Sequence, residues 1–393
     1  MSLPYPVDPT DSEFGRMFSN ISTFVDKFNT TSTSFHDYPC EMLGLTPQIG
    51  AAILPSLRFY LYASTMFVIS GLIGNSLSVL VFSSREMRGI SSNVYLLLLA
   101  ISDSLYLLSV FLTKTLTTIR CLYFPNSAAD IFNRSTTLCK LLQHTMDMFS
   151  DYSTCLILAF TIERYIAIYL PIRFKSLCSV RRARIACATI FIAVCIFIAP
   201  YHIMYIGLFN NYNVCTVLDG FETVFTALYI VEALVFRVIP VFVIALLNGM
   251  IIVRVTKLRR RKRKRNASMT PASQTGGHSN NRNQRTRKAD KSMQLTIILV
   301  LVSTSYILVF IPVLVHFVLW KMRVSNWVDI SDLAMLTSQN YTRTLYISGF
   351  AINFFLYTMS GRIFREQLEK IVCDTQRRDR STVVTSVEAT SVL

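Results

Sequence analysis

Long apolar stretches recur seven times along the chain, and each is close to the length that a helix needs to cross a membrane. Crossing the hydrocarbon core takes about 20 mostly apolar residues. Backbone polar groups in lipid must bond within their own segment, so each stretch is expected to be helical. The stretches cover residues 59–82, 93–116, 138–168, 184–207, 223–253, 293–320 and 343–360. The last stretch is the least apolar. The pattern predicts an all-α fold, a seven-transmembrane helix bundle.

The composition agrees with a membrane protein rather than a soluble one. Of the 393 residues, 52% are hydrophobic and only 16% are charged, whereas about a quarter of a soluble domain is charged. The net charge of +16 would also suit nucleic-acid binding. The basic residues, however, gather beside the apolar stretches, which predicts a role in membrane topology and no nucleic-acid partner.

Basic residues lie mainly on one side of the predicted membrane. Fourteen of the 39 Lys and Arg residues lie in 254–291, whereas residues 1–56 contain only Arg16 and Lys27. Loops rich in Lys and Arg remain in the cytoplasm. We therefore expect a multi-pass protein of the plasma membrane, with an outer N-terminal segment 1–56 and a basic cytoplasmic loop 254–291.

Several side chains are candidates for covalent modification. Four Asn-X-Ser/Thr sequences fall in regions predicted to lie outside and are candidate glycosylation sites. These begin at Asn20, Asn29, Asn133 and Asn340. Cys373 follows the last span and is a candidate for palmitoylation.

Four cysteines are expected outside, where disulfides persist. They are Cys40, Cys121, Cys139 and Cys215, and four cysteines allow three pairings. A bridge between Cys139 and Cys215 would fix the second outer loop to the third span. That pairing would leave Cys40 for Cys121.

Ionisable residues at membrane depth are costly, so each is a candidate for function. Asp103 lies midway along the second stretch, and its expected partners are Asn75, Ser153 and Asn353 on three other stretches. A carboxylate among small polar groups suits a bound cation or water. The alternative is a structural hydrogen-bond cluster.

A second group of charges lies toward the outer ends of the spans. Asp147 and Asp151 are four residues apart and share one helical face, so at least one needs a cationic partner or a raised pKa. Glu232 and Arg237 are five apart and are expected to pair only loosely. The group is interpreted as the lining of an outward-facing wet cavity, with internal ion pairing as the alternative. The candidate ligand-binding residues are Asp147, Asp151, Glu232, Arg237, Lys114, His316, Arg343 and Tyr346.

Short motifs at particular places in the stretches add to this pattern. Gly74-Asn75 lies in the first stretch, Leu99-Ala100-Ile101-Ser102-Asp103 in the second and Glu163-Arg164-Tyr165 at the inner end of the third. Then follow Pro240, Pro312, Asn353-Phe354-Phe355-Leu356-Tyr357 and Gly361-Arg362-Ile363-Phe364-Arg365. As an ordered set, these motifs resemble those of the rhodopsin-like (class A) G-protein-coupled receptors over about residues 56–372.

The resemblance implies a seven-transmembrane domain at 57–360, then a short amphipathic helix and cytoplasmic tail at 361–393, and no enzymatic activity. The residues expected to serve activation and G-protein coupling are Glu163, Arg164, Tyr165, Asn353, Tyr357, Pro312, Phe310 and Pro240. An allosteric sodium ion is implied at Asp103, Asn75, Ser153 and Asn353. Partners would be a heterotrimeric G protein, arrestin after phosphorylation of the tail, and a PDZ protein at Ser391-Val392-Leu393.

Four positions depart from the family's pattern. Phe310 replaces the tryptophan of the sixth span, and Ile190 stands near the place of the fourth span's tryptophan. Asn248 replaces a tyrosine of the fifth span. Phe354 replaces the proline of the seventh span, so the sequence does not decide whether that span is kinked.

The seventh-span segment is similar to that of receptors for FMRFamide-type neuropeptides, which implies an extracellular peptide ligand. Met146 stands where receptors for amines have an aspartate, and Ile347 where opsins have their lysine. The alternatives are a receptor for a non-peptide small molecule and a membrane transporter.

Overall fold

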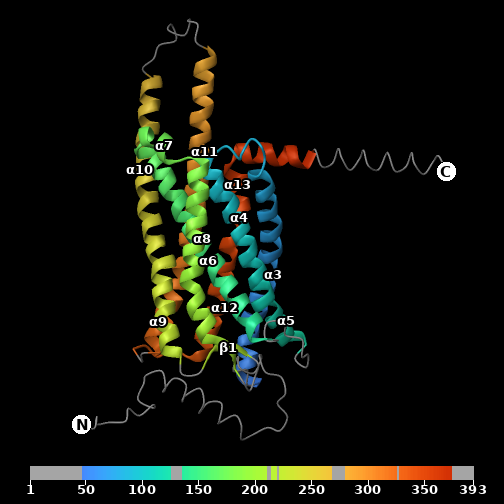
Figure 1. Ribbon diagram of the computed structural model, residues 1–393. Coiled ribbons are helices and arrows are strands. Elements are labelled where there is room, and N and C mark those ends of the chain that lie inside the picture. Colours follow the sequence, from blue (N-terminus) through green and yellow to red (C-terminus); the bar gives the residue numbers. More distant parts are fainter. Residues whose placement is uncertain are drawn as a thin grey trace, which may run out of the picture.

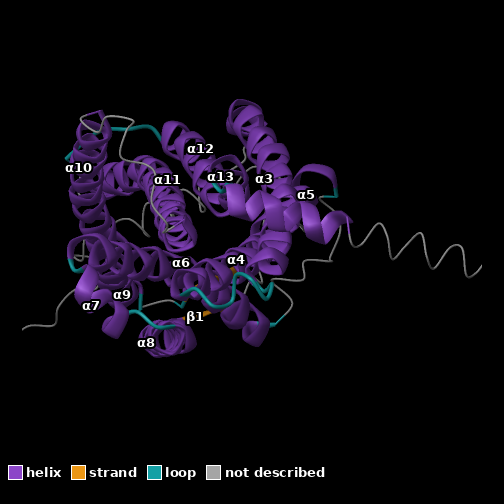
Figure 2. Cartoon of the chain, turned by 90° about the horizontal axis from the view of Figure 1, so that it is seen from above, coloured by secondary structure: helices purple, strands orange, loops and turns teal. Residues whose placement is uncertain are grey.

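The computed structural model describes residues 47–124, 135–209, 214–218, 221–267, 279–324 and 327–373. Seven helical spans stand side by side in this part of the chain (Figures 1 and 2). The long helices are α3 (Pro47–Phe82), α4 (Ser91–Val110), α6 (Thr136–Tyr169), α8 (Val180–Tyr205), α10 (Ile239–Ala267), α11 (Ser279–Val324) and α12 (Asp332–Ala351). The prediction of an all-α seven-helix bundle is confirmed.

Shorter elements extend or connect the spans. They are η2 (Phe111–Thr115), α5 (Leu116–Tyr123), α7 (Pro171–Leu177), β1 (Ile206–Phe209), β2 (Val214–Val217), α9 (Glu222–Ala233), η3 (Leu234–Val238) and α13 (Asn353–Ser360). Strands β1 and β2 form an antiparallel hairpin, in which Leu208 pairs with Cys215. A final helix, 362–373, projects sideways from the bundle (Figure 1).

Five spans are long and apolar enough to cross a membrane by length and composition alone. These are Ile53–Phe82, Ser91–Arg120, Val180–Tyr205, Val224–Arg261 and Gln294–Trp320. The third and seventh spans are more polar. Helix α6 packs against α4, α8, α10 and α11, and α12 packs against α3, α4 and α11. Because neighbouring helices cover these two spans, their polar side chains can bond to protein instead of facing lipid.

Two spans contain a turn of π-helix. The segment η2 lies in the second span, and η3 lies in the fifth span directly before α10. Hydrogen bonds in a π-helix join residues five apart rather than four. Side chains five positions apart, such as those of Glu232 and Arg237, therefore lie close together on one face in these turns.

The seventh span is longer than predicted and has a break. It begins at Asp332 rather than near 343, and it divides at Ile352 between α12 and α13. The break forms although Phe354 occupies the family's proline position. A Cβ atom added at Gly74 would lie 2.7 Å from the Cβ of Phe354, so the missing side chain at Gly74 leaves the space that Phe354 fills.

The basic segment 254–291, predicted as the loop between the fifth and sixth spans, is largely helical where the structure describes it. Helix α10 continues to Ala267 and α11 begins at Ser279, so most of this segment is helical. Lys and Arg are good helix formers. The residues of this segment that disfavour a helix come between the two helices in sequence: Pro271, Gly276 and Gly277.

Close packing between α3 and α12 depends on Gly71. A Cβ atom added there would lie 3.0 Å from the Cα of Ala351, and a backbone atom cannot move aside as a side chain can. We predict that Gly71→Ala lowers the free energy of unfolding by about 1–3 kcal/mol through overpacking. The melting temperature of the purified protein in detergent measures this change.

Gly249→Ala is the matched control, because no atom lies within 4 Å of a Cβ atom added at that position. This substitution should leave the melting temperature unchanged or raise it slightly, since alanine favours helix. Equal losses in both variants would contradict the close contact at Gly71.

Candidate functional site

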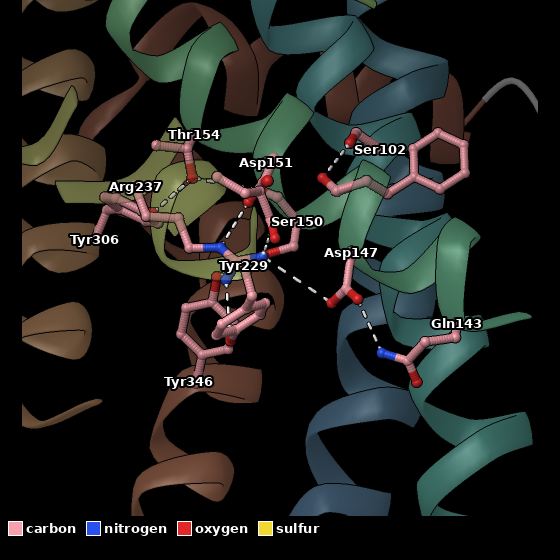
Figure 3. A network of polar contacts seen from close by, with 12 residues as sticks. Ser102, Gln143, Asp147, Ser150, Asp151, Thr154, Tyr229, Arg237, Tyr306 and Tyr346 are labelled. Atoms are coloured by element: carbon pink, nitrogen blue, oxygen red, sulfur yellow. Dashed lines mark hydrogen bonds and ion pairs between the residues drawn. The ribbon is translucent and has the colours of Figure 1, made fainter. Parts of the chain in front are cut away.

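Arg237 is the centre of a buried network of charges inside the bundle (Figure 3). Its Nε donates to Oδ1 of Asp151 at 2.6 Å, and its Nη2 donates to Oε1 of Glu232 at 2.5 Å. The side chains of Asp151 and Glu232 are completely buried. Buried charges need such partners, since removing one member of a buried ion pair lowers the free energy of unfolding by about 3–5 kcal/mol.

These contacts correct two interpretations of the sequence. Glu232 and Arg237 pair closely rather than loosely, because the π-turn of η3 places residues five apart on one face. Asp151 and Glu232 belong to internal ion pairs and do not line an open cavity. The alternative of internal ion pairing therefore describes these two carboxylates, and the pair between Asp151 and Arg237 joins two spans.

Asp147 differs from the other two carboxylates. Its Oδ1 lies 4.0 Å from Nη2 of Arg237, and its Oδ2 accepts a hydrogen bond of 2.8 Å from Gln143. Nε2 of His202 lies 3.1 Å from the same Oδ2. The Asp147 side chain retains 16% of its exposure. Three carboxylates thus surround one guanidinium, and Asp147 is the one that an incoming group can reach.

Tyrosines of three helices border this network. Arg237 donates from Nη1 to the hydroxyl of Tyr229 at 3.2 Å and lies over its ring. The Tyr346 hydroxyl bonds to Ser150, and the Tyr306 hydroxyl bonds to Thr154, each at 2.6 Å. The charges are therefore surrounded by aromatic rings with their polar ends turned inward (Figure 3).

The other candidate ligand residues lie on three helical elements: Lys114 in η2, His316 in α11 and Arg343 in α12. Nδ1 of His316 lies 3.0 Å from Oγ of Ser338 and connects α11 to α12. Sequence reasoning missed His202, because a partner on another helix has no fixed spacing along the chain. It also missed Gln143 and Tyr229, although Gln143 lies four residues before Asp147 on α6, a spacing that could have identified it.

Asp103 is the centre of a second polar cluster, deeper in the bundle. Its Oδ1 accepts from Ser153 and its Oδ2 accepts from Asn353, each at 2.7 Å. Asn75 donates to the carbonyl of Phe350 at 3.0 Å, and its own Oδ1 has no hydrogen-bond partner. A cavity of about 10 Å³ adjoins Asp103, which is enough for about one water molecule. Carboxylate, hydroxyl and amide oxygens are ligands that hard cations prefer, so these residues fit a small cation or a water.

Glu163 and Arg164 bond to each other at the inner end of α6. Oε1 of Glu163 accepts from Nη2 of Arg164 at 2.9 Å, from Ser91 at 2.9 Å and from Ser92. The Arg164 guanidinium also lies 5.8 Å from the ring centre of Phe160. Arg164 is only 3% exposed, so it is held inside the bundle in this conformation.

An aromatic cluster joins the inner ends of the first and seventh spans to the final helix. The ring centres of Phe82, Tyr357 and Phe364 lie 5.4–5.6 Å apart. Tyr165 stacks on Tyr169 at 4.6 Å. Tyr357 is completely buried and its hydroxyl has no hydrogen-bond partner.

Comparison with known families decides the identity of this bundle. The profile of the 7 transmembrane receptor (rhodopsin family) matches residues 74–375. The chain belongs to this receptor family. It is therefore a multi-pass membrane protein and a receptor rather than an enzyme, and membership in a receptor family excludes the transporter alternative.

Individual relatives of the receptor cover less of the chain. The thyrotropin-releasing hormone receptor of Homo sapiens is 28% identical over 46% of this chain and 44% of its own length. The C-C chemokine receptor type 3 of Cavia porcellus is 33% identical over 35% of this chain and 34% of its own. A probable G-protein coupled receptor of Caenorhabditis elegans is 25% identical over 56% of this chain and 52% of its own. The chain thus spans about half the length, or less, of these relatives.

The outer disulfide of the receptor is confirmed. Cys139 and Cys215 are bonded and tie the β1–β2 hairpin to the start of α6. The predicted bridge between Cys40 and Cys121 stays a prediction, because Cys40 lies outside the described residues. A bridge over a chain segment of 76 residues stabilises the folded state by about 4 kcal/mol.

The predicted modification sites have different outcomes. Asn20, Asn29 and Asn133 lie outside the described residues. Asn340 lies within α12, and its amide donates to Ser56 at 3.1 Å. This position inside the bundle counts against glycosylation, which needs an exposed loop. Cys373 is exposed at the end of the final helix, as palmitoylation requires.

Two departures from the family's pattern have partners in the structure. Nδ2 of Asn248 donates to Oγ of Ser303 at 2.6 Å and links α10 to α11. Phe310 stacks on Tyr306 with 6.1 Å between ring centres. Pro240 and Pro312 lie near the start of α10 and inside α11, respectively.

We predict that Ser303→Ala lowers the free energy of unfolding by about 1–3 kcal/mol, because it leaves the buried amide of Asn248 without an acceptor. Ser305→Ala on the same helix is the control, since its half-buried hydroxyl bonds only to the carbonyl of Val302. Thermal unfolding of both variants in detergent should show the larger loss for Ser303→Ala. The reverse order would contradict the link between α10 and α11.

Proposed function

We propose that this receptor binds an extracellular peptide and activates a heterotrimeric G protein in response. The observation that supports a basic ligand best is the excess of carboxylates at Arg237, with Asp147 still reachable. Two of its relatives are, by name, receptors for thyrotropin-releasing hormone and for C-C chemokines.

The ligand that fits these contacts has a basic group and an aromatic group. A cation of the ligand would bond to the free side of Asp147, while Arg237 stays with Asp151 and Glu232. An aromatic side chain would pack among Tyr229 and the neighbouring rings. Neuropeptides of the FMRFamide type have both groups, and we propose this class as the ligand.

Signal transfer would be a shift between two states of the bundle. In the state described here, Arg164 bonds to Glu163. In the active state Arg164 would leave Glu163 and contact the C-terminal helix of a G protein. A sodium ion held by Asp103, Ser153, Asn353 and Asn75 would favour the inactive state and leave on activation.

The proposed receptor would lie in the plasma membrane with its N-terminus outside. Arrestin would bind after phosphorylation of the tail, and a PDZ protein would bind the last three residues. The candidate phosphorylation sites are Ser381, Thr382, Thr385, Ser386 and Thr390. All of these tail residues lie outside the described part of the chain.

A calcium assay with a panel of amidated neuropeptides tests the proposed function. Cells would express the receptor together with a promiscuous G protein. A saturable response to one peptide is expected, and Arg164→Ala should abolish it with surface expression retained. Arg181→Ala changes an exposed arginine at the same end of the bundle and should keep the response. Silence across the panel, with the receptor at the surface, would favour a small-molecule ligand.

Asp147→Asn tests the carboxylate that would contact the ligand. The loss of one charge-assisted contact should lower peptide potency by about 10- to 100-fold. Asn retains an oxygen that can accept the hydrogen bond from Gln143, so surface expression should persist. Asp329→Asn removes an exposed carboxylate near the same end and should change potency little. Equal losses in both variants would indicate a general electrostatic effect instead of a contact.

A further inference from the structure

A cavity much larger than the one at Asp103 lies at the predicted cytoplasmic end, between α3, α4 and the start of α8. Its volume is about 280 Å³, close to the lower end of small-molecule sites at about 300 Å³. Phe82, Val94 and Leu97 supply an apolar wall. The space is large enough for a polar headgroup or a short length of acyl chain.

Two arginines line this cavity from different segments. Arg88 belongs to the turn after α3, and Arg184 belongs to the first turns of α8. Both are exposed, and no carboxylate of the described residues forms an ion pair with either. Glu86, the acid nearest Arg88 in sequence, bonds instead to Lys370 at 3.0 Å and Gln367 at 2.6 Å. Within the described part of the chain, the two positive charges at this cavity therefore have no countercharge.

Asn93, in the first turn of α4, also lines this cavity. The residue is 2% exposed, and its Nδ2 donates to the carbonyl of Met87 at 2.9 Å. Its Oδ1 is buried and has no hydrogen-bond partner. A buried acceptor without a donor costs about 1–3 kcal/mol, so a group that donates a hydrogen bond is expected to satisfy it.

We propose that this cavity binds an anionic phospholipid whose headgroup has hydroxyl groups, such as phosphatidylinositol. Arg88 and Arg184 would contact the phosphate, as arginines do. Oδ1 of Asn93 would accept a hydrogen bond from a headgroup hydroxyl. The apolar wall and the position at the inner ends of the spans favour a membrane lipid over a soluble phosphate, because anionic lipids are abundant in the cytoplasmic leaflet. The site is independent of the proposed peptide ligand.

Native mass spectrometry of the purified full-length receptor tests this site by titration with phosphatidylinositol. The double variant Arg88→Gln with Arg184→Gln should bind the lipid on the order of tenfold more weakly. Arg85→Gln with Arg182→Gln is the matched control. It changes the same turn and the same helix by the same charge, at two exposed arginines that do not line the cavity. The control pair should change binding less than about twofold.

A comparison of lipids tests the hydroxyl contact on the unaltered receptor. Phosphatidylmethanol has the same single charge but no headgroup hydroxyl, and it should bind several-fold more weakly than phosphatidylinositol. Equal losses in the two double variants, or no loss in the lining variant, would overturn the site. Equal affinity for the two lipids would overturn the role of Asn93. Displacement of the lipid by soluble inositol phosphate at similar concentration would overturn the assignment to a membrane lipid.

Discussion

The bond of Arg237 to Asp151 and Glu232 is the interaction on which this part of the receptor depends. A charge at membrane depth is tolerated only when the protein supplies its partner, and here the third and fifth spans meet at one guanidinium. The π-turn in the fifth span aligns Glu232 with Arg237. Because the two buried carboxylates pair with Arg237, Asp147 is left as the acid that the proposed ligand would contact. Structure and proposed recognition thus share one set of charges.

The departures from the family's motifs are compensated locally. Phe354 fills the space beside Gly74, and the seventh span still breaks at Ile352. Asn248 uses its amide to join α10 to α11 where the family has a tyrosine. Phe354 is larger than the family's proline and packs beside Gly74, and Asn248 is shorter than the family's tyrosine and bonds to Ser303. These substitutions therefore preserve the bundle.

Much of the fold was predictable because the membrane limits the choices of the chain. Apolar stretches of the required length predicted seven spans. Of the three partners expected for Asp103, Ser153 and Asn353 bond to it, whereas Asn75 bonds to the carbonyl of Phe350. The close pairing of Glu232 with Arg237 was not predictable, because spacing rules assume an α-helix and the fifth span contains a π-turn. The helical extensions at 254–267 and 279–291 were missed because the ends of the spans were set where the apolar residues stop, and a helix can continue beyond the membrane.

One comparison of stabilities tests directly whether Arg237 neutralises the two buried acids. Arg237→Gln alone leaves Asp151 and Glu232 without a cation, whereas the triple variant with Asp151→Asn and Glu232→Gln removes all three charges. Melting temperatures in detergent should rank the triple variant above Arg237→Gln, although it has more substitutions, because an unpaired buried charge costs more than a neutral polar group. A triple variant less stable than Arg237→Gln alone would contradict the account.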